Sequence, residues 1–212
     1  MKRKITILTC LILSCLICSV FLLRSSNTDI PDGYDLSSHN RNLNWKTLSK
    51  SQFVYLKASE GSTFKDKKYN EYKIIARQHN LKVGAYHFMC NDCSGKKQFE
   101  HYKSVAKKDI DLIPALDVEI SGINKNNIIE FISECEKYYG VKPIIYINYL
   151  YMLNYHSAIK GCKIWLSNKT PFTPLCDYVI EQYAIKKIDG VDIDCNRVNP
   201  KYSIKGILLD KK

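Results

Sequence analysis

The sequence predicts an α/β fold, in which a single domain forms an irregular TIM-like (β/α)5(β)3 barrel behind an N-terminal apolar export segment. Eight short apolar or β-branched runs predict strands, and helical stretches lie between the earlier runs. From Lys163 onward the connections become too short for full helices. Alternating strands and helices favour parallel pairing through right-handed crossovers, and eight such strands favour closure into a barrel.

Residues 1–26 predict an export segment. Lys2, Arg3 and Lys4 precede an uncharged apolar run over residues 5–23, which ends at Arg24. The run is near the lower limit of spanning length, so it fits either a cleaved signal peptide or an uncleaved membrane anchor. A loose lipoprotein-type box would leave Cys15 lipidated, although apolar filling explains the cysteines of this run at least as well. We therefore expect an exported protein, which is either secreted or held in the cell envelope in a membrane-anchored, lipoprotein or periplasmic form.

Residues 27–212 have the length of one domain with a sizeable core. The chain has 32 basic and 21 acidic residues, and without the four basic residues of the export segment 28 remain against 21. In an exported protein this basic charge favours acidic envelope polymers or anionic membrane surfaces, while a solvated basic face without a partner is an equally good explanation. Nucleic acid is not expected as a partner, because the lysines are scattered and lack an aromatic-interleaved motif.

Six cysteines lie in the domain: Cys90, Cys93, Cys135, Cys162, Cys176 and Cys195. An even number of cysteines in an exported domain predicts that some of them form disulfides. The spacing suggests one local pair, Cys90 with Cys93, and buried unpaired cysteine is the alternative for Cys135 and Cys162. No metal site is expected, because a second C-x-x-C or an H-x3-H partner for zinc is missing.

Periodicity places the elements. The strands are expected at residues 33–36, 53–58, 83–88, 112–119, 143–147, 163–166, 178–183 and 191–194. The helices are expected at 67–79, 97–107 and 126–139, where apolar residues recur on one face. Gly140 is expected to end the last of these helices.

In barrels of this type the chemistry gathers at the carboxyl ends of the strands. Polar candidates at these predicted ends are Asp35, Glu60, Tyr86, His87, Asp117, Glu119, Gln182 and Asp194. Each alone has a structural explanation, such as turn capping or a hydrogen-bonded core histidine. Together they are typical of a sugar-binding pocket, which needs several acids and hydrogen-bonding groups around one ring.

The most informative pair is Asp117 and Glu119, which follows the apolar run at 112–116. Alternate residues of a strand project to one face, so the two carboxyl groups are expected to lie together. Repulsion and partial burial would raise the pKa of one of them and keep a proton near neutral pH. Glycosidic-bond cleavage needs such an acid beside a carboxylate, whereas a strand that runs into solvent is the plain alternative for an isolated Asp-x-Glu.

Six segments occur in the order seen in glycoside hydrolase family 25. They are 33–40 (GYDLSSHN), 57–61 (KASEG), 84–88 (GAYHF), 116–119 (LDVE), 143–146 (PIIY) and 194–197 (DCNR). From about residue 32 to 198 the chain therefore resembles the Chalaropsis-type lysozymes, and residues 27–212 are expected to form the catalytic domain. The resemblance implies an irregular barrel with a helix-poor second part, and we expect a monomer.

The resemblance also implies an activity: N-acetylmuramidase, which hydrolyses the β-1,4 bond between N-acetylmuramic acid and N-acetylglucosamine in peptidoglycan. The glycan strands would be the partner, and no cofactor is implied. Glu119 matches the general acid/base of the family. Asp117 matches the acid that orients the 2-acetamido group of the substrate, which favours a substrate-assisted route. Asp35 and Asp194 match the remaining acidic positions and are given electrostatic and positioning roles.

The expected substrate-binding residues are Glu60, Tyr86, His87, Tyr146, Trp165 and Gln182. The chain also departs from the family pattern, because the usual Trp-Gln-Tyr segment is Glu181-Gln182-Tyr183 and an acid replaces an aromatic wall. The main alternative function is a non-catalytic glycan-binding barrel, which retention of all four acids disfavours. A chitinase-like hydrolase is the other alternative, and the lack of the D-x-x-D-x-D-x-E signature disfavours it.

Overall fold

The structure is a computed structural model that describes residues 30–168 and 176–210. The predicted export segment and its apolar run lie outside these ranges. No helix within them is long and apolar enough to cross a membrane. From Pro31 onward the chain forms a compact unit of its own.

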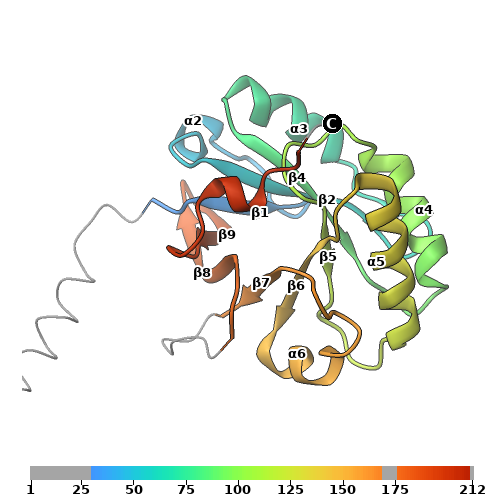
Figure 1. The fold of residues 1–212 in the computed structure, drawn as a ribbon. Helices are drawn as coiled ribbons and strands as arrows, with labels where there is room; N and C mark the ends of the chain where they lie inside the picture. The colour runs from blue at the N-terminus through green and yellow to red at the C-terminus, as the bar shows by residue number, and fades with distance from the viewer. Residues whose placement is uncertain (1–29, 169–175, 211–212) are drawn as a thin grey trace, which may run out of the picture. The chain divides into compact units, whose positions relative to one another are not determined.

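Eight strands close into a barrel (Figure 1). They are β1 (Gly33–Leu36), β2 (Phe53–Glu60), β4 (Lys82–Phe88), β5 (Ala115–Asp117), β6 (Ile144–Asn148), β7 (Ile164–Ser167), β8 (Ile180–Ile188) and β9 (Val191–Val198). Pairing of β1 with β2 closes the ring, and the short β3 (Phe64–Lys65) pairs with the end of β2 outside it. All eight predicted strands are confirmed. The largest boundary errors are at β8, predicted at 178–183 and found at Ile180–Ile188, and at β5, where the predicted run of 112–119 contains only three strand residues.

Five helices of the described ranges follow the first five barrel strands. They are α2 (Trp45–Leu48), α3 (Tyr69–Gln78), α4 (Gly95–Ala106), α5 (Lys125–Tyr139) and α6 (Tyr149–Tyr155). Asn124 caps the first turn of α5, and Gly140 ends this helix in the left-handed conformation, with φ 77°. The predicted (β/α)5(β)3 order is therefore confirmed.

The last strand differs from the parallel pairing that the sequence predicts. β9 runs antiparallel to both β8 and β1, while the other pairs around the ring are parallel. Asp189 and Gly190, both with positive φ, join β8 to β9 in a two-residue connection. Such a tight turn can only produce a hairpin, because a parallel pair needs a long crossover.

The core has two parts, one inside the barrel and one between the strands and the helices. On β2, Phe53 and Tyr55 face the barrel interior, while Val54 and Leu56 pack in the outer cluster. Figure 1 shows α4 and α5 on the outside of the strands. The 3-10 helix η1 (Ile204–Ile207) covers the amino-terminal end of the barrel, where the amide of Ile113 donates to the carbonyl of Ile207 over 2.9 Å. The unit from Pro31 onward thus contains a closed barrel and its complete core, which is what independent folding requires.

The predicted disulfides are not found. All six cysteines of the described ranges are free, including Cys90 and Cys93. Cys135 and Cys195 are buried, so the alternative of buried unpaired cysteine describes Cys135 correctly. Burial also raises the pKa of the Cys90 thiol to about 11, which keeps it protonated and unreactive at neutral pH.

Candidate active site

The strand register brings two groups of side chains to one end of the barrel. Asp117 on β5 is level with Tyr146 on β6, and Tyr146 is level with Trp165 on β7. Across the barrel, Asp35 on β1 is paired with Asp194 on β9. Side chains of paired residues lie on the same side of a sheet, so the aligned residues face the barrel interior together.

A cavity of about 190 Å³ opens between them. Its lining residues are Asp35, Tyr86, Asp117, Glu119, Tyr146, Trp165, Gln182 and Asp194. All four acids predicted as catalytic, and four of the six residues predicted to bind substrate, therefore surround one space. The cavity is strongly acidic and has aromatic walls, a combination that suits a polar ring with apolar faces.

The Asp117–Glu119 pair has one buried and one exposed member. The strand ends at Asp117, but the amide of Val118 still donates to the carbonyl of Tyr146 over 2.9 Å, so the chain stays extended. Asp117 is only 6% exposed, whereas Glu119 is exposed at the mouth of the cavity. Burial, followed by the charges of Glu119 and Asp35, raises the pKa of Asp117 well above the usual range of an aspartate. Its Oδ1 atom accepts no hydrogen bond from the described residues.

Asp35 is held by two amides. Asn196 Nδ2 and Gln182 Nε2 both donate to Asp35 Oδ2, over 2.7 Å and 3.1 Å. The orientation of Asn196 is fixed because its Oδ1 accepts from the indole of Trp165 (2.8 Å), which can only donate. In the same way the hydroxyl of Tyr146 donates to Gln182 Oε1 (3.0 Å). Two donors on one oxygen suit an ionised carboxylate, which is an acceptor only.

The model of glycosyl hydrolases family 25 matches residues 34–172, more than half of the chain. The chain belongs to this family. A family 25 glycosyl hydrolase from Bacillus anthracis is a similar solved structure, with 28% identity and a TM-score of 0.71 over 83% of this chain and 94% of that one. The bacterial lysozyme of Streptomyces coelicolor shares the fold, with 22% identity and a TM-score of 0.70 over 82% and 94% of the two chains.

Among curated relatives, the autolytic lysozyme of Clostridium acetobutylicum is 26% identical over 163 residues, which cover 72% of this chain and 50% of that protein. The chain spans about half the length of the curated relatives that it matches. Membership of family 25 agrees with the barrel and with the position of the acidic cavity at one end of it.

Two residues that the sequence assigns to the family 25 site do not line the cavity. His87 is fully buried on the other side of β4, where its ring stacks on Phe131 of α5 (5.1 Å) and contacts Ser59 and Gln98 through its two nitrogens. His87 therefore does not lie where a substrate in the cavity could contact it, contrary to the prediction. Tyr86 faces inward, so its neighbour in the strand must face outward. Burial lowers the pKa of His87 to about 3, so it is neutral.

Glu60 lies beside the cavity and not in its lining. Its carboxylate is 2.6 Å from Lys57 Nζ, and Lys57 in turn lies over the ring of Phe88 at 4.7 Å. A β-bulge between Lys57 and Ser59 shifts the alternation of β2 just before its end. Because of this shift Glu60 is level with Phe88, which is level with Asp117, so Glu60 lies on the cavity side of the sheet although it is outside the cavity lining.

Asp194 reaches the cavity for a reason different from the expected one. The sequence places it at the carboxyl end of the eighth strand, but β9 continues to Val198 and runs in the opposite direction. Its pairing with Asp35 is what brings it to the rim. Asn196, two residues further along β9, was not predicted as a site residue. The period of two on a strand is the signal that points to it, because Asn196 must face the same side as Asp194.

The acid that replaces the family's aromatic residue, Glu181, accepts a hydrogen bond from Asn168 Nδ2 over 2.7 Å. It is outside the cavity lining, whereas the following Gln182 faces inward. Within residues 30–168 and 176–210, no group of three His, Cys, Asp or Glu side chains is placed to hold a metal ion.

Proposed function

We propose that this family 25 protein is a muramidase that hydrolyses the β-1,4 bond between N-acetylmuramic acid and N-acetylglucosamine in peptidoglycan. The observation that carries the proposal is the pair Asp117 and Glu119, in which one carboxyl group is buried at the cavity wall and the other is exposed at its mouth. Two carboxyl groups in environments this different can divide the roles of proton donor and charge stabiliser.

In the free protein, burial and the neighbouring charges raise the pKa of Asp117 and so favour its protonated form. The 2-acetamido N–H of a bound sugar would donate to Asp117 Oδ1, which has no partner among the described residues. A hydrogen bond to the ionised carboxylate favours ionisation, so binding moves the proton to Glu119. The pair therefore becomes active when the acetamido group is in place.

Glu119 then donates this proton to the glycosidic oxygen as the bond to C1 breaks. The acetamido oxygen attacks C1, and ionised Asp117 stabilises the positive charge that develops on the acetamido group. Water next attacks C1 and gives a proton to Glu119, which opens the ring formed by the acetamido group. Glu119 ends the cycle protonated and Asp117 ionised, and release of the product returns the proton to Asp117.

Asp35 and Asp194 have electrostatic and positioning roles. Asn196 and Gln182 orient the carboxylate of Asp35, which faces the cavity. Its negative charge would stabilise the oxocarbenium-like positive charge that develops there. Tyr86, Tyr146 and Trp165 supply the walls on which sugar rings pack.

The domain organisation in this proposal is the one that the sequence predicts. Residues 1–26 act as signal peptide or membrane anchor and residues 27–212 as the catalytic domain, which works as a monomer on glycan strands. Export to the cell envelope or beyond brings the enzyme to its substrate, as the wall-degrading activity requires.

The test is digestion of purified peptidoglycan by residues 27–212. Muropeptides with muramic acid at the new reducing end are expected, and Glu119→Gln should abolish their release. Glu136→Gln, which removes an exposed carboxylate of α5, is the matched control and should leave release unchanged. Equal product from Glu119→Gln would refute the role of Glu119. Binding of peptidoglycan without any release would favour the glycan-binding barrel, and cleavage of chitin oligosaccharides alone would favour the chitinase-like reading.

A further inference from the structure

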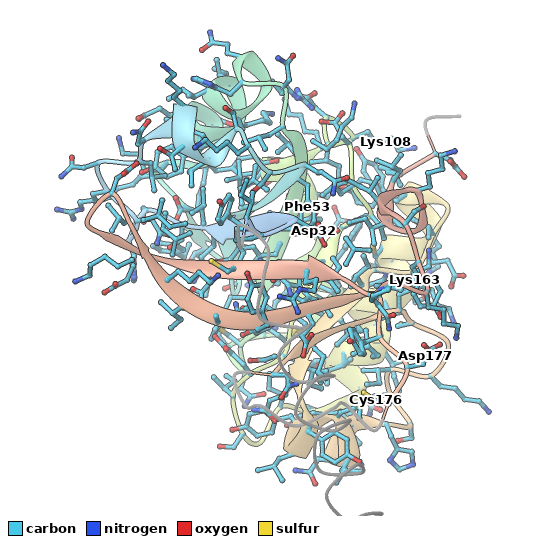
Figure 2. All side chains as sticks on the ribbon, turned by 90° about the vertical axis from the view of Figure 1, so that its left-hand side faces the viewer. Asp32, Phe53, Lys108, Lys163, Cys176 and Asp177 are labelled. Carbon is cyan, nitrogen blue, oxygen red and sulfur yellow. The ribbon has the colours of Figure 1, made fainter. Side chains whose placement is uncertain are left out.

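The amino-terminal end of the barrel carries a cluster of lysines. It is formed by the segments that lead into the parallel strands, together with η1. Besides Lys201, which is paired with Asp177, seven exposed lysines lie on this basal face: Lys50, Lys82, Lys107, Lys108, Lys160, Lys163 and Lys205. Figure 2 shows Lys108 and Lys163 on the same side of the domain, although 55 positions separate them in the chain. The topology, and not a sequence motif, brings these charges together.

Two carboxylates near the basal face are paired with cations other than these seven lysines. Asp109 is engaged by Lys73 and Arg77 of α3, and Asp177 is engaged by Lys201. None of the seven exposed lysines forms an ion pair with a described carboxylate. Seven like charges that form no ion pair create a positive potential at this end of the barrel, which attracts an anionic surface.

The opposite end of the barrel has the reverse character, because the acidic cavity opens there. The domain is thus polarised along its barrel axis. A surface that binds the basal face leaves the cavity open to solvent on the far side.

The position of the first described residues adds a second argument. The chain enters β1 from the basal face, and this entry is fixed where Ser51 Oγ donates to the carbonyl of Pro31 (2.6 Å) and the amide of Gln52 donates to the carbonyl of Asp32 (2.8 Å). Asp32 is labelled near the middle of the domain in Figure 2. The predicted export segment of residues 1–26 precedes this entry in the chain.

We propose that the basal face binds the surface of an anionic membrane, so that the acidic cavity is directed away from the bilayer. Lipid phosphates match the lysines in charge, and the export segment predicted at residues 1–26 would bring the protein to a membrane. Each lysine near an anionic bilayer contributes roughly a fivefold gain in binding. Seven lysines on one face are enough to orient the domain even without the apolar segment.

The test is sedimentation of residues 27–212 with vesicles, since this part contains the closed barrel and its core. Binding is expected to vesicles of phosphatidylglycerol mixed with phosphatidylcholine and not to phosphatidylcholine alone, and it should fall steeply between about 0.1 and 0.5 M salt. The quadruple variant Lys82→Gln, Lys108→Gln, Lys160→Gln and Lys205→Gln should lose at least about a hundredfold in binding.

A matched control removes the same charge from the other end of the barrel. Lys65, Lys96, Lys97 and Lys125 are exposed near the carboxyl ends of the strands, and their quadruple change to glutamine should reduce binding by less than about tenfold. Both variants should hydrolyse soluble peptidoglycan fragments at the unaltered rate.

Three results would overturn the proposal. Equal losses in the two quadruple variants would mean that net charge, and not the basal face, drives binding. Equal binding to neutral and anionic vesicles would exclude lipid phosphate as the ligand. Tighter binding to soluble polyphosphate than to vesicles of equal phosphate content would assign the face to an acidic polymer.

Discussion

Asp117→Asn is expected to make the protein more stable and less active. The carboxyl group is 6% exposed, its Oδ1 has no hydrogen-bond partner among the described residues, and Glu119 and Asp35 add like charge. Because the pKa of this carboxyl group is raised in the folded protein, folding at pH 7 favours uptake of a proton, which costs about 1.4 kcal/mol for each pH unit by which the pKa of the unfolded chain is exceeded. A neutral amide of the same shape needs no proton, so the free energy of unfolding at pH 7 should rise by about 1–3 kcal/mol, which is about 2–4 °C in Tm per kcal/mol for a domain of this size.

The raised pKa of Asp117 also determines how the stability of the protein changes with pH. Because the pKa of Asp117 is raised in the folded protein, the folded state binds more protons than the unfolded state at pH values above about 4. The stability of the unaltered protein therefore falls as pH rises through this window, and Asp117→Asn removes this fall. The advantage of the variant should be largest near pH 7 and vanish near pH 4.

Urea denaturation of residues 27–212 at several pH values measures the effect, and muropeptide release measures the loss of activity. Asp177→Asn is the control, because hydrogen bonds from Tyr202 and Lys201 lower the pKa of that exposed carboxyl group. Its change should give no gain at pH 7. A gain for Asp117→Asn that is equal at pH 4 and pH 7, or a loss at pH 7, would refute the argument from burial and repulsion.

Three further predictions concern the packing of the site. The losses in kcat/KM caused by Trp165→Phe and Asn196→Ala should be non-additive by about 0.5–1.5 kcal/mol, because Trp165 donates to Asn196 and Asn196 donates to Asp35. Losses that add within about 0.3 kcal/mol would contradict this chain of hydrogen bonds. Gly84→Ala should cost about 1–3 kcal/mol in urea denaturation, since its Cβ would lie 2.3 Å from the ring of Tyr55, and an unchanged midpoint would contradict this close approach. His87→Gln should leave KM unchanged. The unaltered protein should lose stability between about pH 6.5 and 3, because His87 has a pKa of about 3 when folded and binds a proton more readily when unfolded. His87→Gln should reduce this loss. A raised KM in the variant would mean that His87 does contact the substrate.

Much of the fold could be predicted because strands and helices depend on local sequence patterns. The apolar runs that become β1, β2 and β4 have the length of strands, and the helix that becomes α5 has a cap at each end. The shortening of the connections after Lys163 gave the helix-poor part of the barrel correctly. The antiparallel course of β9 was predictable in principle from Asp189-Gly190, which is a strong two-residue hairpin signal.

The candidate site was predicted where the period of two and the strand ends sufficed, and missed where they did not. Asp35, Asp117 and Tyr86 follow from their strands. His87 lies one residue further along than Tyr86 and faces the opposite way, so proximity in sequence misled. The side of the sheet on which Glu60 lies depends on a β-bulge between Lys57 and Ser59, which has no signature in the residues themselves.

The sequence by itself determined the order of strands and helices, the family, and the residue types that carry the chemistry, because these depend on neighbours in the chain. Only the tertiary structure decided which carboxyl group is buried, which amides orient Asp35, and that seven lysines gather at one end of the barrel. Burial, hydrogen bonding and summed charge depend on residues far apart in the chain. Asp117 and Glu119 look alike in the sequence, and closure of the barrel is what makes them different.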